Sequence, residues 1–312
     1  MIEYTRREGT ALYEWNESIQ KMLDWIEENI GEKPTLTKMS EQIGYSPYYC
    51  SVQFHKICGM TIKRYISGRR LALAALELRD TKERIIDIAF KYGFSSQEAL
   101  TRAFVTAFGC APAAYRRNPI PVPLPVRKVV FFPEHYYELY KGGVKMSDIT
   151  EAKVRVEFIP AHRYIGIWDD EAENYGSFWE RHNCDEICGT IDSMSNVSDP
   201  IITGHTAGWS LKNGKRRYFY GIGVPADYSG AVPEGFEIRD IPAGYYLVFY
   251  HPPFDFLKDN GEVMGRVERL AWNYDISEYG GGKYIWNDNA PCYQRHYPEG
   301  IGYEVLRPIK LK

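Results

Sequence analysis

The side chains that could act on a metal or a substrate are few and scattered in this sequence. Cys184, Cys188 and His182 could lie on one face of a helix, and thiol and imidazole groups of this kind ligate zinc. Their spacing is not a standard zinc pattern, and no second pair completes a site. The seven histidines form no HExxH motif, and GxSxG, P-loop and dinucleotide-binding motifs are missing. We therefore expect no metal, no cofactor and no catalytic residue.

Positive charge is concentrated in one segment, and the chemistry that it favours is the binding of a polyanion. The whole chain carries a formal net charge of −3, yet residues 31–117 carry +7. The flanking segments are acidic, at −4 for residues 1–30 and −6 for residues 118–312. A local excess of Lys and Arg is typical of nucleic-acid-binding domains. The alternative is a solvated basic surface on a set of helices.

Length and composition indicate a folded protein of more than one domain. The 312 residues are 44% hydrophobic and 25% charged, which excludes a disordered or fibrous chain. No apolar run approaches the roughly 18–20 residues of a membrane span. Six cysteines are too few for a disulfide scaffold, so we expect reduced thiols in a cytoplasmic protein. Prolines at every second position from 119 to 125 predict an extended linker. We expect domains over residues 1–117 and 151–312, joined by a Pro-rich linker over 118–150.

Apolar spacing in the first domain predicts an all-helical fold with two helix-turn-helix units in tandem. Gly44 and Gly93 lie 49 residues apart, and each separates a short helix from a longer one. Phe54 and Phe104 are the core residues of the two longer helices. Residues 69–79 form a strong helix that would join the units. A helix, a glycine turn and a second helix form the arrangement that places the second helix in the DNA major groove.

The second unit resembles a known family of DNA-binding proteins. Its sequence, IAFKYGFSSQEALTRAFVTAFGCAPAAYRR, is similar to the signature of AraC/XylS-type transcription regulators. Residues from about 16 to 117 fit the DNA-binding domain of that family. The resemblance implies two recognition helices that enter successive faces of the major groove.

The resemblance also implies which side chains face DNA. Gln97 can pair with adenine, Arg102 with guanine or phosphate, and Glu98 can accept from cytosine. The first helix lacks long polar side chains, so we expect it to read methyl groups and shape. A phosphate contact would position the protein without specifying sequence. The implied DNA-contacting residues are Tyr48, Ser51, Val52, Lys56, Ser96, Gln97, Glu98, Thr101 and Arg102, with Lys63, Arg64 and Arg70 as further phosphate candidates.

The second domain contains an internal repeat. Residues 154–168 align with residues 236–250 at a constant offset of 82, around a shared Ile-Pro-Ala. We expect an α+β domain of two pseudo-symmetric strand–helix–strand repeats, with a cleft between the copies. The expected helices are 177–187 and 263–272, and the expected closing strands are 217–224 and 302–310.

This domain resembles the GyrI-like effector-binding domain, and its fusion to the helical head resembles the Rob-like architecture. The resemblance is carried by IPAGYYLVFY, by Tyr293-x-x-His-Tyr297 and by the terminal YEVLRPI. It implies an aromatic pocket that binds lipophilic, often cationic, compounds around a buried carboxylate. Glu304 occupies the carboxylate position, and Gln294 stands where a second acid is frequent. For each implied lining aromatic, core packing is the alternative. The lining candidates are Trp168, Tyr175, Trp209, Tyr218, Tyr220, Tyr246, Tyr293 and Tyr303.

These features together predict a ligand-responsive transcription regulator that is not an enzyme. The expected partners are double-stranded promoter DNA and a small lipophilic or cationic effector, with RNA polymerase as a further candidate and no membrane. We expect a monomer or a weak homodimer. One alternative is a GyrI-like hydrolase that opens electrophilic rings with Glu157, Glu180 or Glu304. The others are a domain that sequesters drugs and a tail that makes only protein contacts.

Overall fold

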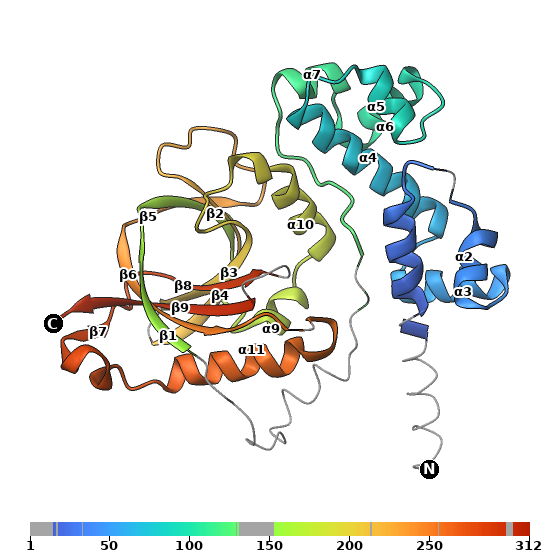
Figure 1. Ribbon diagram of the computed structural model, residues 1–312. Helices are drawn as coiled ribbons and strands as arrows, with labels where there is room; N and C mark the ends of the chain where they lie inside the picture. Colours follow the sequence, from blue (N-terminus) through green and yellow to red (C-terminus); the bar gives the residue numbers. More distant parts are fainter. Residues whose placement is uncertain are drawn as a thin grey trace, which may run out of the picture. The chain divides into compact units, whose positions relative to one another are not determined.

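The computed structural model describes residues 15–16, 18–32, 34–128, 130, 153–212, 214–254, 256–297 and 302–312. These residues form two compact units (Figure 1). The first comprises Met1–Phe132 together with Cys188–Ser193, and the second comprises Pro133–Ile187 and Met194–Lys312. Within the described ranges, no helix has both the length and the apolar character that crossing a bilayer requires.

The first unit is helical throughout its regular structure, as the sequence predicts. A helix over residues 18–28 precedes two pairs of helices, and a long helix lies between the pairs. In each pair a glycine in the left-handed region, Gly44 (φ 74°) or Gly93 (φ 72°), follows the shorter helix. The helices are α2 (Leu36–Ile43), α3 (Pro47–Cys58), α4 (Ile62–Asp80), α5 (Ile85–Lys91), α6 (Gln97–Phe108) and α7 (Pro112–Arg117).

Helices α3 and α6 begin and end by the same devices. The hydroxyl of Ser46 accepts from the Tyr49 N–H at 3.3 Å, and that of Ser96 accepts from the Ala99 N–H at 3.2 Å. A serine at this position satisfies one of the backbone donors that the first helical turn leaves without a partner. Both helices end at a glycine with φ 71°, a conformation that side chains with a Cβ disfavour.

Two hydrophobic clusters hold the first unit together, and α4 contributes to both. Ile62, Tyr65 and Ile66, in the first part of α4, pack with Phe54 in one cluster. Leu71, Ala75 and Leu78, in its second part, pack in the other cluster with the equivalent Phe104. The helix that the sequence predicts over 69–79 therefore begins earlier, at Ile62, and is the common element of the two helix-turn-helix units.

The Pro-rich segment is neither helix nor strand over residues 119–128. Its apolar side chains nevertheless belong to the cores of the first unit. Val122 and Leu124 are buried in the cluster of Phe104, and Val130 is buried in that of Phe54. The later part of the expected linker, residues 131–150, lies outside the described residues.

In the described part of the second unit, nine strands form one antiparallel sheet in the order β1-β6-β9-β8-β3-β4-β2-β5, with β7 paired to β9. Figure 1 shows that this sheet is strongly curled and that α11 lies along it. The strands are β1 (Lys153–Ile159), β2 (His162–Trp168), β3 (Gly204–Lys212), β4 (Lys215–Pro225), β5 (Glu237–Ile241), β6 (Gly244–His251), β7 (Tyr284–Trp286), β8 (Cys292–Tyr297) and β9 (Gly302–Leu311).

The helices of the second part of the chain differ in one respect from expectation. The predicted helix at 263–272 is the C-terminal part of α11 (Phe256–Asn273), which packs against β6 and β9. The predicted helix at 177–187 is instead two helices, α9 (Tyr175–Trp179) and α10 (Cys184–Ser193). At the break between them, Arg181 and His182 donate to the buried Asp169 carboxylate. The remaining short elements are the 3-10 helices η1 (Ser195–Val197) and η2 (Ile276–Gly282).

Candidate functional site

The exposed face of α3 gathers all the DNA-contact residues that the sequence predicts for it. Tyr48 is 78% exposed and Val52 is 42% exposed, and Ser51 and Lys56 are exposed as well. Tyr48, Val52 and Lys56 follow one another at intervals of four, which places them on one side of the helix. Phe54 points instead into the core, where it is fully buried. The face is thus an aromatic and aliphatic strip with one cation.

The exposed face of α6 is more polar. Gln97, Glu98 and Arg102 are exposed, and Thr101 is half-buried. Ser96 is engaged by the helix itself, because its hydroxyl is the N-cap and also donates to the Glu98 carboxylate. This bond, together with the backbone N–H groups of the first turn, lowers the pKa of Glu98. Glu98 is therefore an acceptor at neutral pH.

The further phosphate candidates separate into two kinds. Lys63 and Arg64 are exposed in the first turn of α4. Arg70 is half-buried, and its guanidinium donates to the backbone carbonyls of Ile30 (2.9 Å) and Glu32. Burial lowers its pKa. Arg70 thus joins α4 to the end of the first helix, and this contact fixes the arrangement of the head.

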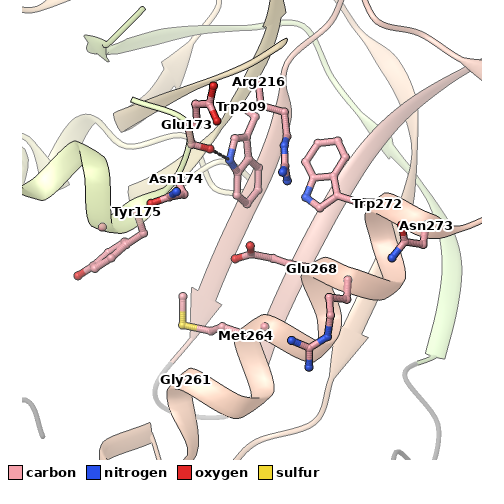
Figure 2. A pocket seen from close by; sticks show the side chains of 13 residues that line it. Glu173, Asn174, Tyr175, Trp209, Arg216, Gly261, Met264, Glu268, Trp272 and Asn273 are labelled. Atoms are coloured by element: carbon pink, nitrogen blue, oxygen red, sulfur yellow. Dashed lines mark hydrogen bonds between the residues drawn. The ribbon is translucent and has the colours of Figure 1, made fainter. Parts of the chain in front are cut away.

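The second unit contains a cavity of about 420 Å³ between α11, the loop before α9 and the β3–β4 hairpin. Its volume lies within the range of about 300–1,000 Å³ that is usual for small-molecule sites. Figure 2 shows side chains from these elements pointing into it. The lining residues are Glu173, Asn174, Tyr175, Gly176, Trp209, Arg216, Gly261, Met264, Gly265, Glu268, Arg269, Trp272 and Asn273.

The carboxylate at the centre of this cavity is Glu268 (Figure 2). The hydroxyl of Tyr303, on β9, donates to its Oε1 at 2.9 Å. Loss of solvent raises the pKa of Glu268, against the opposing effects of this hydrogen bond and of the nearby Arg216 and Arg269. An acid in this setting gains stabilisation when a cation enters.

Two indoles form the aromatic wall of the cavity. The rings of Trp209 and Trp272 meet edge to face, with centroids 5.4 Å apart. The Trp209 Nε1–H donates to the Glu173 carbonyl at 3.2 Å. The Arg216 guanidinium carbon lies 4.7 Å from the centroid of Trp272. The wall thus already contains one cation–aromatic contact.

Of the aromatics that the sequence assigns to a ligand pocket, only Tyr175 and Trp209 line this cavity. Tyr246 and Tyr293 are buried in the core of the sheet, with centroids 5.9 Å apart. Trp168 packs against that core and lies under the guanidinium of Arg239, and Tyr220 packs on Trp179.

Glu304 is buried in an ion-pair network away from the cavity lining. It is 1% exposed, and its carboxylate accepts from Arg155 at 2.6 Å and from the Arg295 Nε at 2.9 Å. The same two arginines bind Glu157, at 3.0 and 2.8 Å. Burial favours a raised pKa for Glu157, but the two guanidinium groups outweigh it and lower the pKa. Two carboxylates and two guanidinium groups thus balance one another.

Comparison with known proteins identifies the helical unit. A family model described as a helix-turn-helix domain matches residues 39–118. The transposon Tn10 TetD protein of Escherichia coli is 43% identical over 100 residues, which are 32% of this chain and 72% of TetD. The multiple antibiotic resistance protein MarA of Salmonella typhimurium is 38% identical over 99 residues, which are 32% of this chain and 78% of MarA. The chain belongs to the AraC/XylS family of transcription regulators.

The predicted DNA-binding head of this AraC/XylS-family regulator is confirmed by these matches, and double-stranded DNA is its partner. The matches to TetD and MarA cover about a third of the chain. The solved structure of SAV2435 bound to tetraphenylphosphonium is 17% identical and covers 51% of this chain and 94% of that one, with a TM-score of 0.37. Among the described residues there is no cluster of His, Cys, Asp and Glu that could hold a metal ion.

The central residues of the cavity in this regulator were not predicted from the sequence; they are Glu268, Trp272, Arg216 and Met264. A signal was present in α11, where Met264, Glu268 and Trp272 recur at intervals of four and therefore share one face. A carboxylate between a thioether and an indole on such a face indicates a site rather than a solvated surface. No local pattern marks Arg216, since only the fold brings the β3–β4 hairpin to this helix.

Proposed function

We propose that this protein is a ligand-responsive regulator whose head binds a promoter sequence-specifically and whose second unit binds a lipophilic cation. The observation that carries the effector proposal is Glu268, a half-buried carboxyl group with a raised pKa that lines a cavity walled by Trp209 and Trp272. A GyrI-like origin for the second unit belongs to the same proposal. The ligand acts by binding two states of the protein unequally and so changing DNA affinity or polymerase recruitment.

For the head, the exposure of the predicted residues supports sequence reading by both α3 and α6. Arg102 and Gln97 have side chains long enough to reach base edges, and Glu98 is ionised and can accept from cytosine. Tyr48 and Val52 suit contact with thymine methyl groups. Lys56 adds a phosphate contact that fixes the register.

For the cavity, the physics of its walls supports a cationic ligand. A desolvated cation is stabilised by the negative face of an aromatic ring and by a carboxylate in a medium of low dielectric constant. Met264 adds a flexible apolar surface that can fit different shapes. Glu268 takes the role that the sequence assigned to Glu304, which remains a prediction as a ligand-binding residue and is held by Arg155 and Arg295.

The alternative of a hydrolase needs carboxylates that can exchange protons. Glu157 and Glu304 each accept from two arginines. The guanidinium groups lower the pKa of Glu157, so this carboxylate is poorly suited to act as a general acid. This network supports a protein that is not an enzyme. A domain that only sequesters drugs differs from an effector domain in one measurable respect, because its ligand leaves promoter affinity unchanged.

We also propose that the second unit arose from two copies of a strand–helix–strand module. Strand order supports this, because the sequence of strands from the β1 edge inward matches that from the β5 edge when β5, β6, β8 and β9 are equated with β1, β2, β3 and β4. Register supports it too. Trp168 pairs with Phe219, and Tyr250, 82 residues after Trp168, pairs with Glu304.

The test is the binding of tetraphenylphosphonium to the full chain, followed by quenching of tryptophan fluorescence. Tetraphenylborate, which has the same shape and the opposite charge, is the control ligand. We expect Glu268→Gln to weaken the phosphonium by about tenfold and to leave the borate unweakened. Asp259→Asn, the same change of charge on an exposed residue of α11, is the matched control. Equal affinity of wild type and Glu268→Gln for the phosphonium would refute the site.

Binding should depend on pH through the raised pKa of Glu268. A cation binds the ionised carboxylate, so below that pKa binding must also release a proton. Affinity for the phosphonium is therefore expected to rise with pH and to level off above the pKa. In Glu268→Gln the slope should vanish. A promoter titration with and without the ligand then separates an effector from a sequestered drug.

A further inference from the structure

The cavity of the second unit already contains a cation of its own. Arg216 lines the cavity, and its guanidinium carbon lies 4.7 Å from the centroid of the Trp272 ring. Figure 2 shows the guanidinium beside the indole, above Glu268. Its charge also acts on Glu268, where it counteracts the rise in pKa that burial causes. Arg216 thus makes the two interactions that an entering cation would make.

A second arginine, Arg307, contacts the same indole from a buried position. Arg307 also lies 4.7 Å from the Trp272 centroid and 3.6 Å from that of Trp286. It is 7% exposed and donates to the Ala271 carbonyl at 2.7 Å. These contacts fix Arg307 in the interior, where it supports the indole.

Arg216, unlike Arg307, is exposed, so its side chain can move away from the Trp272 ring. It is exposed at the start of β4, two residues after Gly214, whose φ of 73° belongs to the β3–β4 turn. A long side chain at an exposed strand end can turn its charged group into water with little loss of solvation. Removing Arg216 from the ring therefore costs mainly one cation–aromatic contact and its attraction to Glu268.

We infer that Arg216 is an internal competitor that occupies the cation site of this cavity and that an effector must displace. The inference rests on the proposed function of the cavity and adds its selectivity. A ligand binds only if its contacts with Trp272 and Glu268 exceed those of the guanidinium that it replaces. Broad aromatic cations meet this condition, because they also cover Trp209 and Met264. Small ammonium ions do not.

The test compares tetraphenylphosphonium binding to the full chain and to Arg216→Ala. We expect about 3- to 30-fold tighter binding by the variant, since the competing contact is absent. Binding of tetramethylammonium should be detectable in Arg216→Ala and not in wild type. Arg216→Met keeps the length of the side chain without the charge and should give the same direction of change if the alanine variant folds poorly. The phosphonium affinity of Arg216→Lys should lie between that of Arg216→Ala and that of wild type.

Two variants separate displacement from a simple change of charge. Arg269→Ala removes a cation of the same cavity lining whose charge also acts on Glu268, so it should tighten phosphonium binding, but by less than Arg216→Ala does. Arg239→Ala removes a guanidinium that lies 4.0 Å from the centroid of the Trp168 ring, outside the cavity lining, and should change phosphonium affinity by less than about twofold. Tightening by Arg269→Ala equal to that of Arg216→Ala, or unchanged or weaker binding by Arg216→Ala, would overturn the inference. Absence of phosphonium binding in wild type, Arg216→Ala and Glu268→Gln alike would instead refute the proposed function.

Discussion

Helices α3 and α6 are alike inside and different outside. Both have twelve residues, both begin after a serine N-cap and both end at a glycine with φ 71°. Phe54 and Phe104, fifty positions apart, are each fully buried and each pack against a tyrosine. At the predicted DNA-contact positions with the same offset, every pair differs: Tyr48 and Glu98, Ser51 and Thr101, and Val52 and Arg102.

The difference lies in the positions that packing and capping leave unrestricted. Burial and capping restrict which residues can occupy the interior and the ends of the helices, so the two copies agree there. The exposed face has no such restriction and can diverge. On α3 it is suited to methyl groups and shape, and on α6 to hydrogen bonds and charge. We expect α6 to contribute most of the base discrimination and α3 to contribute mainly fit.

The largest expected effect tests the likeness of the interiors. Phe54→Ala and Phe104→Ala should each lower the free energy of unfolding by about 3–5 kcal/mol, because each leaves a cavity beside a buried tyrosine. Chemical denaturation followed by circular dichroism measures both. A loss below about 1 kcal/mol in one variant alone would show that the two cores are not equivalent.

The tyrosines that contact these phenylalanines should behave differently. The Tyr65 hydroxyl donates to the Glu27 carboxylate at 2.6 Å, whereas the Tyr115 hydroxyl is buried without a hydrogen-bond partner among the described residues. Tyr65→Phe should therefore cost about 1.5–3 kcal/mol of unfolding free energy. Tyr115→Phe should cost nothing and can stabilise the protein. The same denaturation experiment decides, and equal losses would contradict the assignment.

The exposed faces are compared through Arg102 and Val52, which occupy equivalent positions. Arg102→Ala should weaken binding to a selected promoter fragment by about 1–3 kcal/mol and relax selectivity at one base pair. Val52→Ala should cost less than about 1 kcal/mol, since it removes two methyl groups from a contact that carries no hydrogen bond. Footprinting titrations on the fragment and on single-base variants measure both. Unchanged discrimination in Arg102→Ala would remove its role at a base edge.

The smallest effect concerns the N-caps. Ser46→Ala and Ser96→Ala should each lower the free energy of unfolding by about 1 kcal/mol, because each leaves one backbone N–H of the first turn without its acceptor. Thermal unfolding of the pair is the measurement, with Ser95→Ala as a control one residue from a cap. A loss of about 1 kcal/mol in one cap variant and no loss in the other would mean that the two N-caps do not contribute alike.

Local signals predicted the head well. Turn glycines, helical spacing and the recurrence of Phe54 at Phe104 lie within a few turns of one another, so the sequence alone reveals both helix-turn-helix units. In the second unit, the sequence predicted the strands that flank Ile-Pro-Ala. It did not reveal which aromatics face a cavity. Strand pairing decides that, and it places Tyr246 and Tyr293 in the core.

The carboxylate of the cavity was not identified from the sequence either, because its neighbours are distant along the chain. Glu304 occupies the carboxylate position that the GyrI-like resemblance implies, which made it the candidate from sequence. Its two guanidinium partners come from β1 and β8, and strand pairing brings these segments to it from 149 and 9 residues away. Glu268 meets Arg216 only through the packing of α11 beside the β3–β4 hairpin. Contacts between residues so far apart in the sequence produce no periodic pattern from which they could be predicted.

One consequence follows from the way α4 is shared between the two clusters of the head. A helix advances about 1.5 Å and turns about 100° for each residue. With Ile62 fixed in one cluster and Leu78 in the other, α4 sets both the separation and the rotational phase of the two units. On the proposed binding of DNA by both α3 and α6, the operator must match that phase. A base pair inserted between its two halves should then weaken binding far more than most single-base substitutions within either half. The length of α4 thus determines the spacing that the two halves of the operator need.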